Sequence, residues 1–304
     1  MTKVRDKVTI MHKTIWVAAA ASLLCACGEQ AAAEDGAWLR REIERARDGA
    51  TINVPSGDYD MSDVTFSKDL TLVGPPDRSA VLRAANVTDK GVLVPTGGAN
   101  LTIENLTFKD VTAWDRNGAG VRFEGRNLTV VNCLFDGNED GILATGDDSG
   151  VIRIRNSDFI DSGFGDGQSH GVYVDGAALV EVTDSRFIGT RIGHHLKSVA
   201  QKTVVTGSFF DDARGRTSYA IDMPAGGEAI IRGNTLVQSV DSDNWAIFNY
   251  DLGKGGAPVS LTIEGNKVTN HYHGGVLFRN DTRIKPVVRD NEIDNKGRAP
   301  LKIQ

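Results

Sequence analysis

Residues 128–160, LTVVNCLFDGNEDGILATGDDSGVIRIRNSDFI, contain one full period of a repeat. Asn132 is followed three positions later by Phe135, and 24 residues further along Asn156 is followed in the same way by Phe159. Each pair comes after a short segment in which polar and apolar residues alternate, as they do in a strand. Pairs of a small residue and a bulky apolar residue recur along the chain, at Asn105/Phe108, Asp184/Phe187, Gly207/Phe210, Gly233/Leu236, Gly265/Val268 and Asp290/Ile293.

The spacing of these pairs predicts a solenoid. Their small residues are 23 to 32 positions apart, which lies within the period of about 20–50 residues that is typical of stacked repeats. Asn, Asp and Gly suit tight turns with left-handed backbone, and the apolar residue that follows should stack on its counterpart in the next coil. The 34 glycines and the 7% aromatic content favour a turn-rich β architecture over a helical bundle. We therefore predict an all-β, single-stranded parallel β-helix.

The sequence also predicts a helix over residues 36–48, where apolar residues recur at helical spacing and Gly49 follows as a stop. Such a helix would cap the first coil, whose core and strand edges are otherwise exposed. Residues 50–59, ATINVPSGDY, come next and resemble the opening of pectate-lyase-like proteins, which are right-handed parallel β-helices. The resemblance implies one right-handed β-helix domain over residues 36–304, with a capping helix at its N-terminus.

The N-terminus has the features of an export signal. A basic stretch precedes an apolar run over residues 15–25, which is too short to cross a membrane. The run ends in LCACG (residues 24–28), which resembles the lipobox of bacterial lipoproteins. The resemblance implies cleavage before Cys27 and a lipid on its sulfur, and Gly28 in the next position implies sorting to an outer membrane if the host is Gram-negative. We expect a signal peptide over residues 1–26, a tether over residues 27–35, and an exported protein with a lipid anchor in the cell envelope.

Charge and cysteine content exclude other classes of protein. The formal charge of −6 becomes −9 without residues 1–26, which carry four basic side chains and one acid, so no general basic surface exists for nucleic acid. The three cysteines predict no disulfide, because Cys25 would be removed, Cys27 lipidated, and Cys133 buried as an inert thiol. Motifs for structural zinc or EF-hand calcium are missing. No metal ligand or cofactor is assigned, and the acidic turn at residues 136–140 leaves calcium as an open alternative.

A second strand follows each turn, and its outward positions predict the functional surface. These strands align on a residue that must face the core, at Val121, Ile142, Val172, Leu196, Ile221, Ile247 and Val276. Because side chains alternate along a strand, the next position faces outward. That outward column reads Arg122, Leu143, Tyr173, Lys197, Asp222, Phe248 and Leu277. Two positions further, the same face is expected to carry Asp175, Tyr250 and Arg279.

Titratable side chains concentrate in the middle coils. The starts of these strands add three of the five histidines beyond residue 26, and one tyrosine: His170, His194, His195 and Tyr219. Equivalent residues of successive coils lie about 4.8 Å apart and can therefore touch. Arg214 and Arg216 lie in an adjoining turn, so an acidic chain has gathered cations along one stretch. A polymer of sugar acids laid across these coils would find partners for its carboxylates there.

The family resemblance implies a chemistry for this surface. Pectate-lyase-like proteins bind polysaccharides along an outward sheet, and many cleave uronic-acid polymers by β-elimination. That reaction needs a neutralised substrate carboxylate, a base at C5 and an acid for the leaving oxygen. We expect Lys197 or His195 to be the base and Tyr173 or Tyr219 the acid, with Asp222 beside Lys197. The substrate-binding set is predicted to be His170, His194, Asp175, Arg122, Arg214, Arg216, Tyr250 and Arg279.

The predicted function is therefore a polysaccharide lyase that acts on an acidic, uronic-acid-containing polymer. Hydrolysis through Asp175 and Asp222, and epimerisation at C5, are alternatives on the same fold. A non-catalytic β-helix that binds glycan or serves in envelope assembly is the alternative from another class. Against it, a scaffold has no need to gather His, Lys, Tyr and Asp on consecutive coils. The sequence leaves the polymer and the oligomeric state open.

Overall fold

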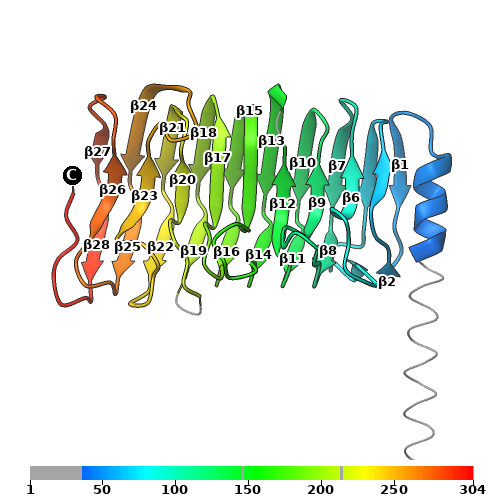
Figure 1. Cartoon of the computed structure of the whole chain (residues 1–304), viewed down its shortest axis with the longest axis horizontal. Coiled ribbons are helices and arrows are strands. Elements are labelled where there is room, and N and C mark those ends of the chain that lie inside the picture. The colour runs from blue at the N-terminus through cyan, green and yellow to red at the C-terminus, as the bar shows by residue number, and fades with distance from the viewer. Residues whose placement is uncertain (1–35, 146, 213–214, 304) are drawn as a thin grey trace, which may run out of the picture.

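The computed structural model describes residues 36–145, 147–212 and 215–303. Within them the chain forms a parallel β-solenoid of about nine turns, closed at one end by a single helix over residues 36–45 (Figure 1). The predicted all-β parallel solenoid and its capping helix are confirmed, although the helix ends three residues before the predicted boundary. The predicted signal peptide, the tether with Cys27, and Arg214 lie outside the described residues.

Every strand pair is parallel, and the strands form two sheets. The larger sheet comprises β1 (Ala50–Asn53), β3 (Val64–Phe66), β4 (Leu70–Val73), β6 (Gly91–Pro95), β7 (Asn100–Glu104), β9 (Ala119–Phe123), β10 (Asn127–Val131), β12 (Asp140–Ala144), β13 (Asp147–Arg155), β15 (Val172–Thr183), β17 (Leu196–Ala200), β18 (Lys202–Thr206), β20 (Ile221–Met223), β21 (Gly226–Arg232), β23 (Ala246–Tyr250), β24 (Ala257–Glu264), β26 (Val276–Asn280) and β27 (Val287–Arg289). The smaller sheet comprises β2 (Gly57–Asp60), β5 (Ala80–Arg83), β8 (Leu106–Lys109), β11 (Leu134–Asp136), β14 (Asp158–Ile160), β16 (Arg186–Ile188), β19 (Phe209–Asp211), β22 (Thr235–Gln238), β25 (Lys267–Asn270) and β28 (Glu292–Asn295).

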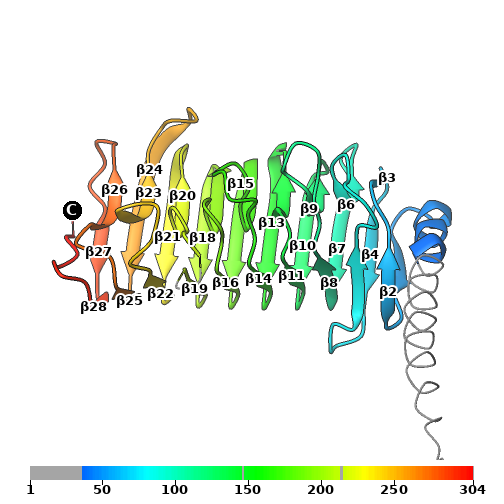
Figure 2. The same ribbon diagram turned by 60° about the horizontal axis from the view of Figure 1, so that its bottom comes forward.

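The larger sheet turns a corner, so each coil has three sides. We call the row of β3, β6, β9, β12, β17, β20, β23 and β26 the first face, and the row of β1, β4, β7, β10, β13, β18, β21, β24 and β27 the second face. The long strand β15 belongs to both, because it runs through the corner without a break. The chain passes from the first face over the corner to the second face, then to the smaller sheet, and back to the first face of the next coil. Figure 2 shows this stacking from a second side.

The predicted internal ladder of apolar residues lies under the smaller sheet. Phe108, Phe135, Phe159, Phe187 and Phe210 are buried and stacked, with ring centroids 4.7–4.9 Å apart and ring planes within 8° of parallel. Burial of one such side chain contributes about 1.5–3 kcal/mol to stability. Cys133 is buried beside this ladder, and burial raises the pKa of its thiol to about 12. The predicted burial of Cys133 is therefore confirmed, and burial disfavours its thiolate form.

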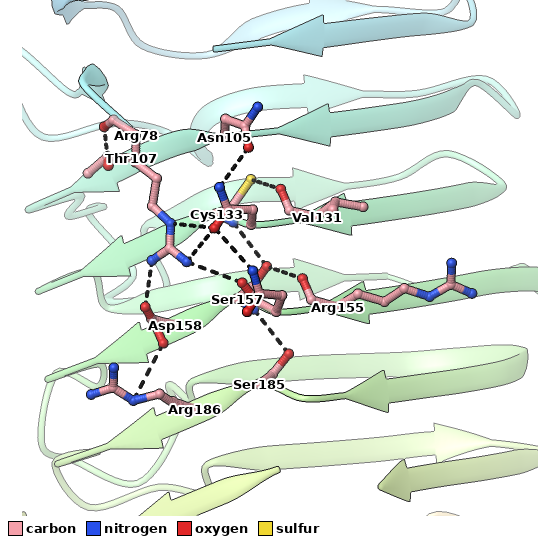
Figure 3. A network of polar contacts seen from close by, with 12 residues as sticks. Arg78, Asn105, Thr107, Val131, Cys133, Arg155, Ser157, Asp158, Ser185 and Arg186 are labelled. Atoms are coloured by element: carbon pink, nitrogen blue, oxygen red, sulfur yellow. Dashed lines mark hydrogen bonds and ion pairs between the residues drawn. The ribbon is translucent and has the colours of Figure 1, made fainter. Parts of the chain in front are cut away.

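The small residues of the repeat form the turns between the second face and the smaller sheet. Asn105, Asn132 and Asn156 have φ angles of +59°, +51° and +49°, which is the left-handed conformation expected there. Their amides form a ladder, because Asn132 donates to Asn105 at 2.7 Å and Asn156 donates to Asn132 at 3.3 Å. Arg78 lies across this asparagine ladder and donates to Asn132 at 2.7 Å. The same guanidinium pairs with Asp158 (Figure 3). One arginine thus joins its own coil to the coils of Asn132 and Asp158, which lie two and three coils further along.

Candidate functional site

The strand register places a column of polar residues on the outside of the first face. Neighbours in this column pair across the coils as Arg122–Leu143, Leu143–Tyr173, Tyr173–Lys197, Lys197–Asp222, Asp222–Asn249 and Asn249–Arg279. We call the part from Tyr173 to Arg279 the strip. The predicted side-by-side placement of Tyr173, Lys197 and Asp222 is confirmed, although these residues are 24 and 25 positions apart in the sequence.

The predicted column was wrong in its last two coils. Phe248, not Ile247, pairs with the inward Ile221, and Asn249 pairs with Asp222. A shift of one residue exchanges the two sides of a strand. In the last coil Phe278, not Val276, pairs with the inward Phe248. Phe248 and Leu277 are both fully buried, and Asn249 and Arg279 take the outward positions.

Two predicted site residues are buried away from the strip. Tyr250 is fully buried, where its hydroxyl donates to the Gly227 carbonyl at 2.7 Å and accepts from the Val259 amide at 3.2 Å. His195 is 1% exposed, and its Nδ1 lies 2.7 Å from the Thr190 hydroxyl. His195 precedes β17, so strand alternation does not govern its side chain. The expected outward positions of Tyr250 and His195 are both wrong.

Three rings form a stack at the edge of the strip, where the strands of the first face begin. His170 and His194 have ring centroids 4.9 Å apart, and His194 and Tyr219 have centroids 5.2 Å apart. The backbone amide of His194 donates to His170 Nδ1 at 3.0 Å, and the amide of Tyr219 donates to His194 Nδ1 at 3.1 Å. Burial lowers the pKa of His194 to about 3 and that of His170 well below its usual value. Both imidazoles are thus neutral, with the proton on Nε2.

Asp222 lies at the centre of the strip and is only 4% exposed. Its Oδ1 accepts a 2.7 Å hydrogen bond from Asn249, and its Oδ2 lies 3.3 Å from His194 Nε2 and 3.9 Å from Lys197 Nζ. Burial raises the pKa of Asp222 to about 6, although the Asn249 hydrogen bond and the Lys197 charge oppose the shift. Because His194 is neutral, the ion pair of Asp222 is with Lys197.

Tyr173 and Lys197 form the exposed part of the strip. The Tyr173 hydroxyl donates to Asp175 at 2.6 Å, and Lys197 Nζ lies 5.0 Å from the centre of the tyrosine ring. Burial and the hydrogen bond to Asp175 raise the pKa of Tyr173 to about 12, so the phenol is protonated at neutral pH. The Lys197 side chain is 19% exposed and is flanked by the phenol on one side and by Asp222 on the other.

Arg279 closes the strip on its C-terminal side. Its guanidinium donates to the Tyr219 hydroxyl at 3.5 Å, pairs with Asp281, and lies 4.0 Å from Asp251. The hydrogen bonds that its guanidinium donates to Asp281 and Tyr219 raise the pKa of Arg279, which therefore keeps its charge. Arg122 lies in the same column two coils before Tyr173, with its Nε 3.5 Å from Glu124. Arg216 is exposed in the turn before β20 and lies 3.7 Å from Asp243.

Sequence reasoning missed three residues of this site. Asn249 holds Asp222, and Asp251 accepts a 3.0 Å hydrogen bond from the same Asn249 amide. Lys254 lies 3.6 Å from Asp175 and 5.8 Å from the centre of the Tyr173 ring. The correct register would have revealed Asn249 and Asp251, whereas Lys254 lies in the loop after β23 and has no periodic signal. Among the described residues, no group of three or more His, Cys, Asp or Glu side chains is arranged to hold a metal ion.

Comparisons with known proteins agree with the fold. The model of the family described as "Right handed beta helix region" matches residues 140–303, which is more than half of the chain. No curated protein matches the sequence. Among the described residues, no helix has both the length and the hydropathy to span a membrane.

Several solved structures are similar to this chain. The PL6 family alginate lyase AlyGC is 16% identical, with a TM-score of 0.46, and the match covers 87% of this chain and 38% of AlyGC. An alginate lyase from Paenibacillus sp. str. FPU-7 is 15% identical over 88% of this chain and 97% of its own, with a TM-score of 0.41. ORF18 of Geobacillus virus E2 is 12% identical over 97% and 66%, with a TM-score of 0.42. The chain thus spans 38% of the length of AlyGC. By its family match, the chain belongs to the right-handed β-helix region family.

Proposed function

We propose that this chain cleaves an acidic, uronic-acid-containing polysaccharide by β-elimination on the strip. The observation that carries the proposal is the position of Lys197, which faces outward between the protonated phenol of Tyr173 and the carboxylate of Asp222. A second observation supports it. The side-chain oxygen of Asn249, next to Asp222, is buried and accepts no hydrogen bond from the described residues. Buried acceptors normally have partners, so this part of the strip is poised for one more donor.

Lys197 is the base that the geometry favours. His170 and His194 each use Nδ1 to accept a backbone amide hydrogen bond, and burial lowers the pKa of both. Asp222 is buried and held by Asn249, so it positions Lys197 and does not face a substrate. A bound polymer would cover Lys197 and bring its C5 proton to the amine nitrogen, which is the role of a general base.

The remaining roles follow from charge and protonation. Arg279 neutralises the substrate carboxylate, which makes the proton at C5 more acidic. Lys197 takes that proton, the electron pair forms the double bond between C4 and C5, and the C4–O bond breaks. Tyr173 gives its phenolic proton to the leaving oxygen. The lysine then releases its proton to water and the tyrosine recovers one.

The hydrolytic alternative has less support in the site. It requires two carboxyl groups on opposite sides of one glycosidic bond. Asp175 is exposed, but Asp222 is 4% exposed and its Oδ1 is held by Asn249. Epimerisation would use the same base and acid as elimination, and it differs in leaving the polymer intact.

The test is digestion of a panel of acidic polysaccharides, including alginate, polygalacturonate and a glycosaminoglycan, with the full chain. Elimination predicts new ultraviolet absorbance from the unsaturated uronate, and products one water lighter than hydrolysis products. New reducing ends without that absorbance would assign hydrolysis instead. Altered sugar configuration without shortening would assign epimerisation, and no change in any polymer would favour the non-catalytic class.

We also propose that the activity resides in the cell envelope, through a lipid on Cys27. The lipobox-like residues 24–28 support this placement. Replacement Cys27→Ser should move the expressed full chain from the membrane fraction to the soluble fraction of a Gram-negative host, because a stable anchor needs the acyl chains. Cys133→Ser, which changes a buried thiol, is the matched control and should leave the fractionation unchanged.

A further inference from the structure

A groove of about 450 Å³ lies beside the strip, at the corner between the first and second faces. Its surface includes Ala200 and Gln201 from the coil of Lys197, Ala225 and Gly227 from the coil of Asp222, and Lys254 and Val259 from the coil of Asn249. This volume is in the range of about 300–1,000 Å³ that holds small ligands. The groove therefore continues the strip in the direction of the strands.

Loop lengths create this groove. β15 passes the corner without a loop, and β17 to β18 and β20 to β21 pass it in one or two residues, whereas the β23–β24 loop has six residues (251–256). Figure 2 shows that loop projecting beyond the neighbouring corners. Its Lys254 amide donates to the Pro224 carbonyl at 2.8 Å. Gly256 has a φ angle of +78°, and a Cβ there would lie 2.3 Å from the Ala225 carbonyl oxygen, so glycine lets the loop lie against the groove floor.

The groove combines apolar walls with one cation, Lys254, and one carboxylate, Asp148. Val259 is 63% exposed although it is a large apolar residue, and Ala200 and Ala225 form a floor of small side chains. Lys254 joins the groove to the strip, because its Nζ lies 5.8 Å from the centre of the Tyr173 ring and 3.6 Å from Asp175, the hydrogen-bond partner of Tyr173. A pyranose ring with a carboxylate matches this arrangement, since it presents a C–H face to apolar walls and an anion to the lysine.

We propose that the groove is the subsite for the uronate residue next to the one that reacts on the strip. The ring of that residue packs on Val259 and Ala225, and its carboxylate binds the Lys254 ammonium. The substrate chain thus passes over the corner along the strands. This inference rests on the proposed function, which identifies the polymer as a polyuronate. It adds that the site recognises at least two neighbouring uronate residues.

The test is calorimetric binding of alginate-derived oligouronates, from dimer to hexamer, to the full chain carrying Lys197→Ala, which binds without turnover. Affinity should rise when the oligomer becomes long enough to enter the groove. Adding Val259→Asp should remove that rise in affinity, which means that Kd for the longer oligomers increases about tenfold. The reason is that the substitution places a negative charge beside the substrate carboxylate. Val287→Asp is the matched control, since Val287 is a 48% exposed valine on β27 outside the groove, and it should bind like the parent chain.

Other outcomes separate the two proposals. Equal binding of all lengths by the parent and by the Val259→Asp and Lys254→Ala chains would overturn the groove subsite, whatever the digestion assay shows. Loss of affinity to the same extent for dimer and hexamer would also overturn it, and so would no binding of any oligomer. Length-dependent binding that Val259→Asp removes, with no double bond formed by the unsubstituted chain, would support the groove and contradict only the elimination.

Discussion

Two stacks of polar residues run along this solenoid, the asparagine ladder and the strip. They differ in how completely their polar side chains are paired. In the asparagine ladder, Asn132 binds the side-chain amides of its neighbours and the guanidinium of Arg78, so the polar groups satisfy one another. On the strip, Lys197 and Tyr173 are partly exposed, and the Asn249 side-chain oxygen accepts no hydrogen bond from the described residues. The same period builds both stacks. A repeat can thus bring polar residues together either as a structural ladder or as a site, and the unpaired Asn249 oxygen distinguishes the strip from the ladder.

The largest expected effect comes from removing the proposed base. Lys197→Met should lower the rate of double-bond formation by about 10²–10⁴-fold, which is the usual contribution of a general base. Lys202→Met is the matched control, because Lys202 pairs with Glu228 on the second face, and its rate should stay within about twofold of the parent. Initial rates and thermal unfolding should be measured together. A full rate in a folded Lys197→Met chain would show that Lys197 is not the base, and the strip would then have no functional distinction from the asparagine ladder.

Asp222 should make both stability and activity depend on pH. Its folded-state pKa is raised to about 6 from 3.8, so the folded chain holds this proton more tightly than the unfolded chain does. Its contribution to stability is therefore complete below pH 3.8 and lost as the pH rises to about 6, by on the order of 3 kcal/mol. Activity should move in the opposite direction, because only the ionised carboxylate pairs with Lys197.

Asp222→Asn tests this dependence. Denaturant unfolding at a series of pH values should show that the difference in stability between parent and variant changes between pH 3.8 and about 6 and is constant above. The fall in activity below pH 6 should be missing in the variant, whatever its remaining rate. If the activity of the Asp222→Asn chain still falls below pH 6 as it does in the parent, a group other than Asp222 is responsible for that fall.

The smallest expected effect belongs to the asparagine ladder. Arg78→Ala should lower the free energy of unfolding by about 1–3 kcal/mol, because it leaves Asn132 and Asp158 without their shared partner. Activity per folded molecule should not change. Arg83→Ala removes an exposed pair with Asp58 and should cost less than about 1 kcal/mol. If Arg78→Ala reduces turnover as strongly as stability, the two stacks are not functionally separate.

The fold was predictable because the same pair, a small residue followed by a bulky apolar residue, recurs at a nearly regular spacing. Asn132 and its equivalents require left-handed backbone, and Phe135 and its equivalents need an apolar neighbour in the next coil. Both the turn residue and the apolar residue recur in successive coils, so the sequence repeats the pattern that predicts the fold many times. The capping helix was predictable for a different reason, since the open end of a solenoid needs a cover.

The site was predictable only where alternation was clear. Tyr173, Lys197 and Asp222 follow an inward apolar residue and precede another inward position, so their side was set. In β23 the run Ala246-Ile247-Phe248 is apolar throughout and fully buried, so hydropathy could not choose the register. His195 lies before its strand, and Lys254 reaches the site from a loop, so neither follows the period of the coils.

The most direct test of the strip as the substrate site is a crystal structure of the full chain carrying Lys197→Ala with a bound oligouronate. We predict a uronate on the first face, with its C5 toward position 197, its carboxylate in hydrogen-bond reach of Arg279 and its glycosidic oxygen near the Tyr173 hydroxyl. An oligosaccharide bound only to the second face or to the smaller sheet, with the strip empty, would contradict the account.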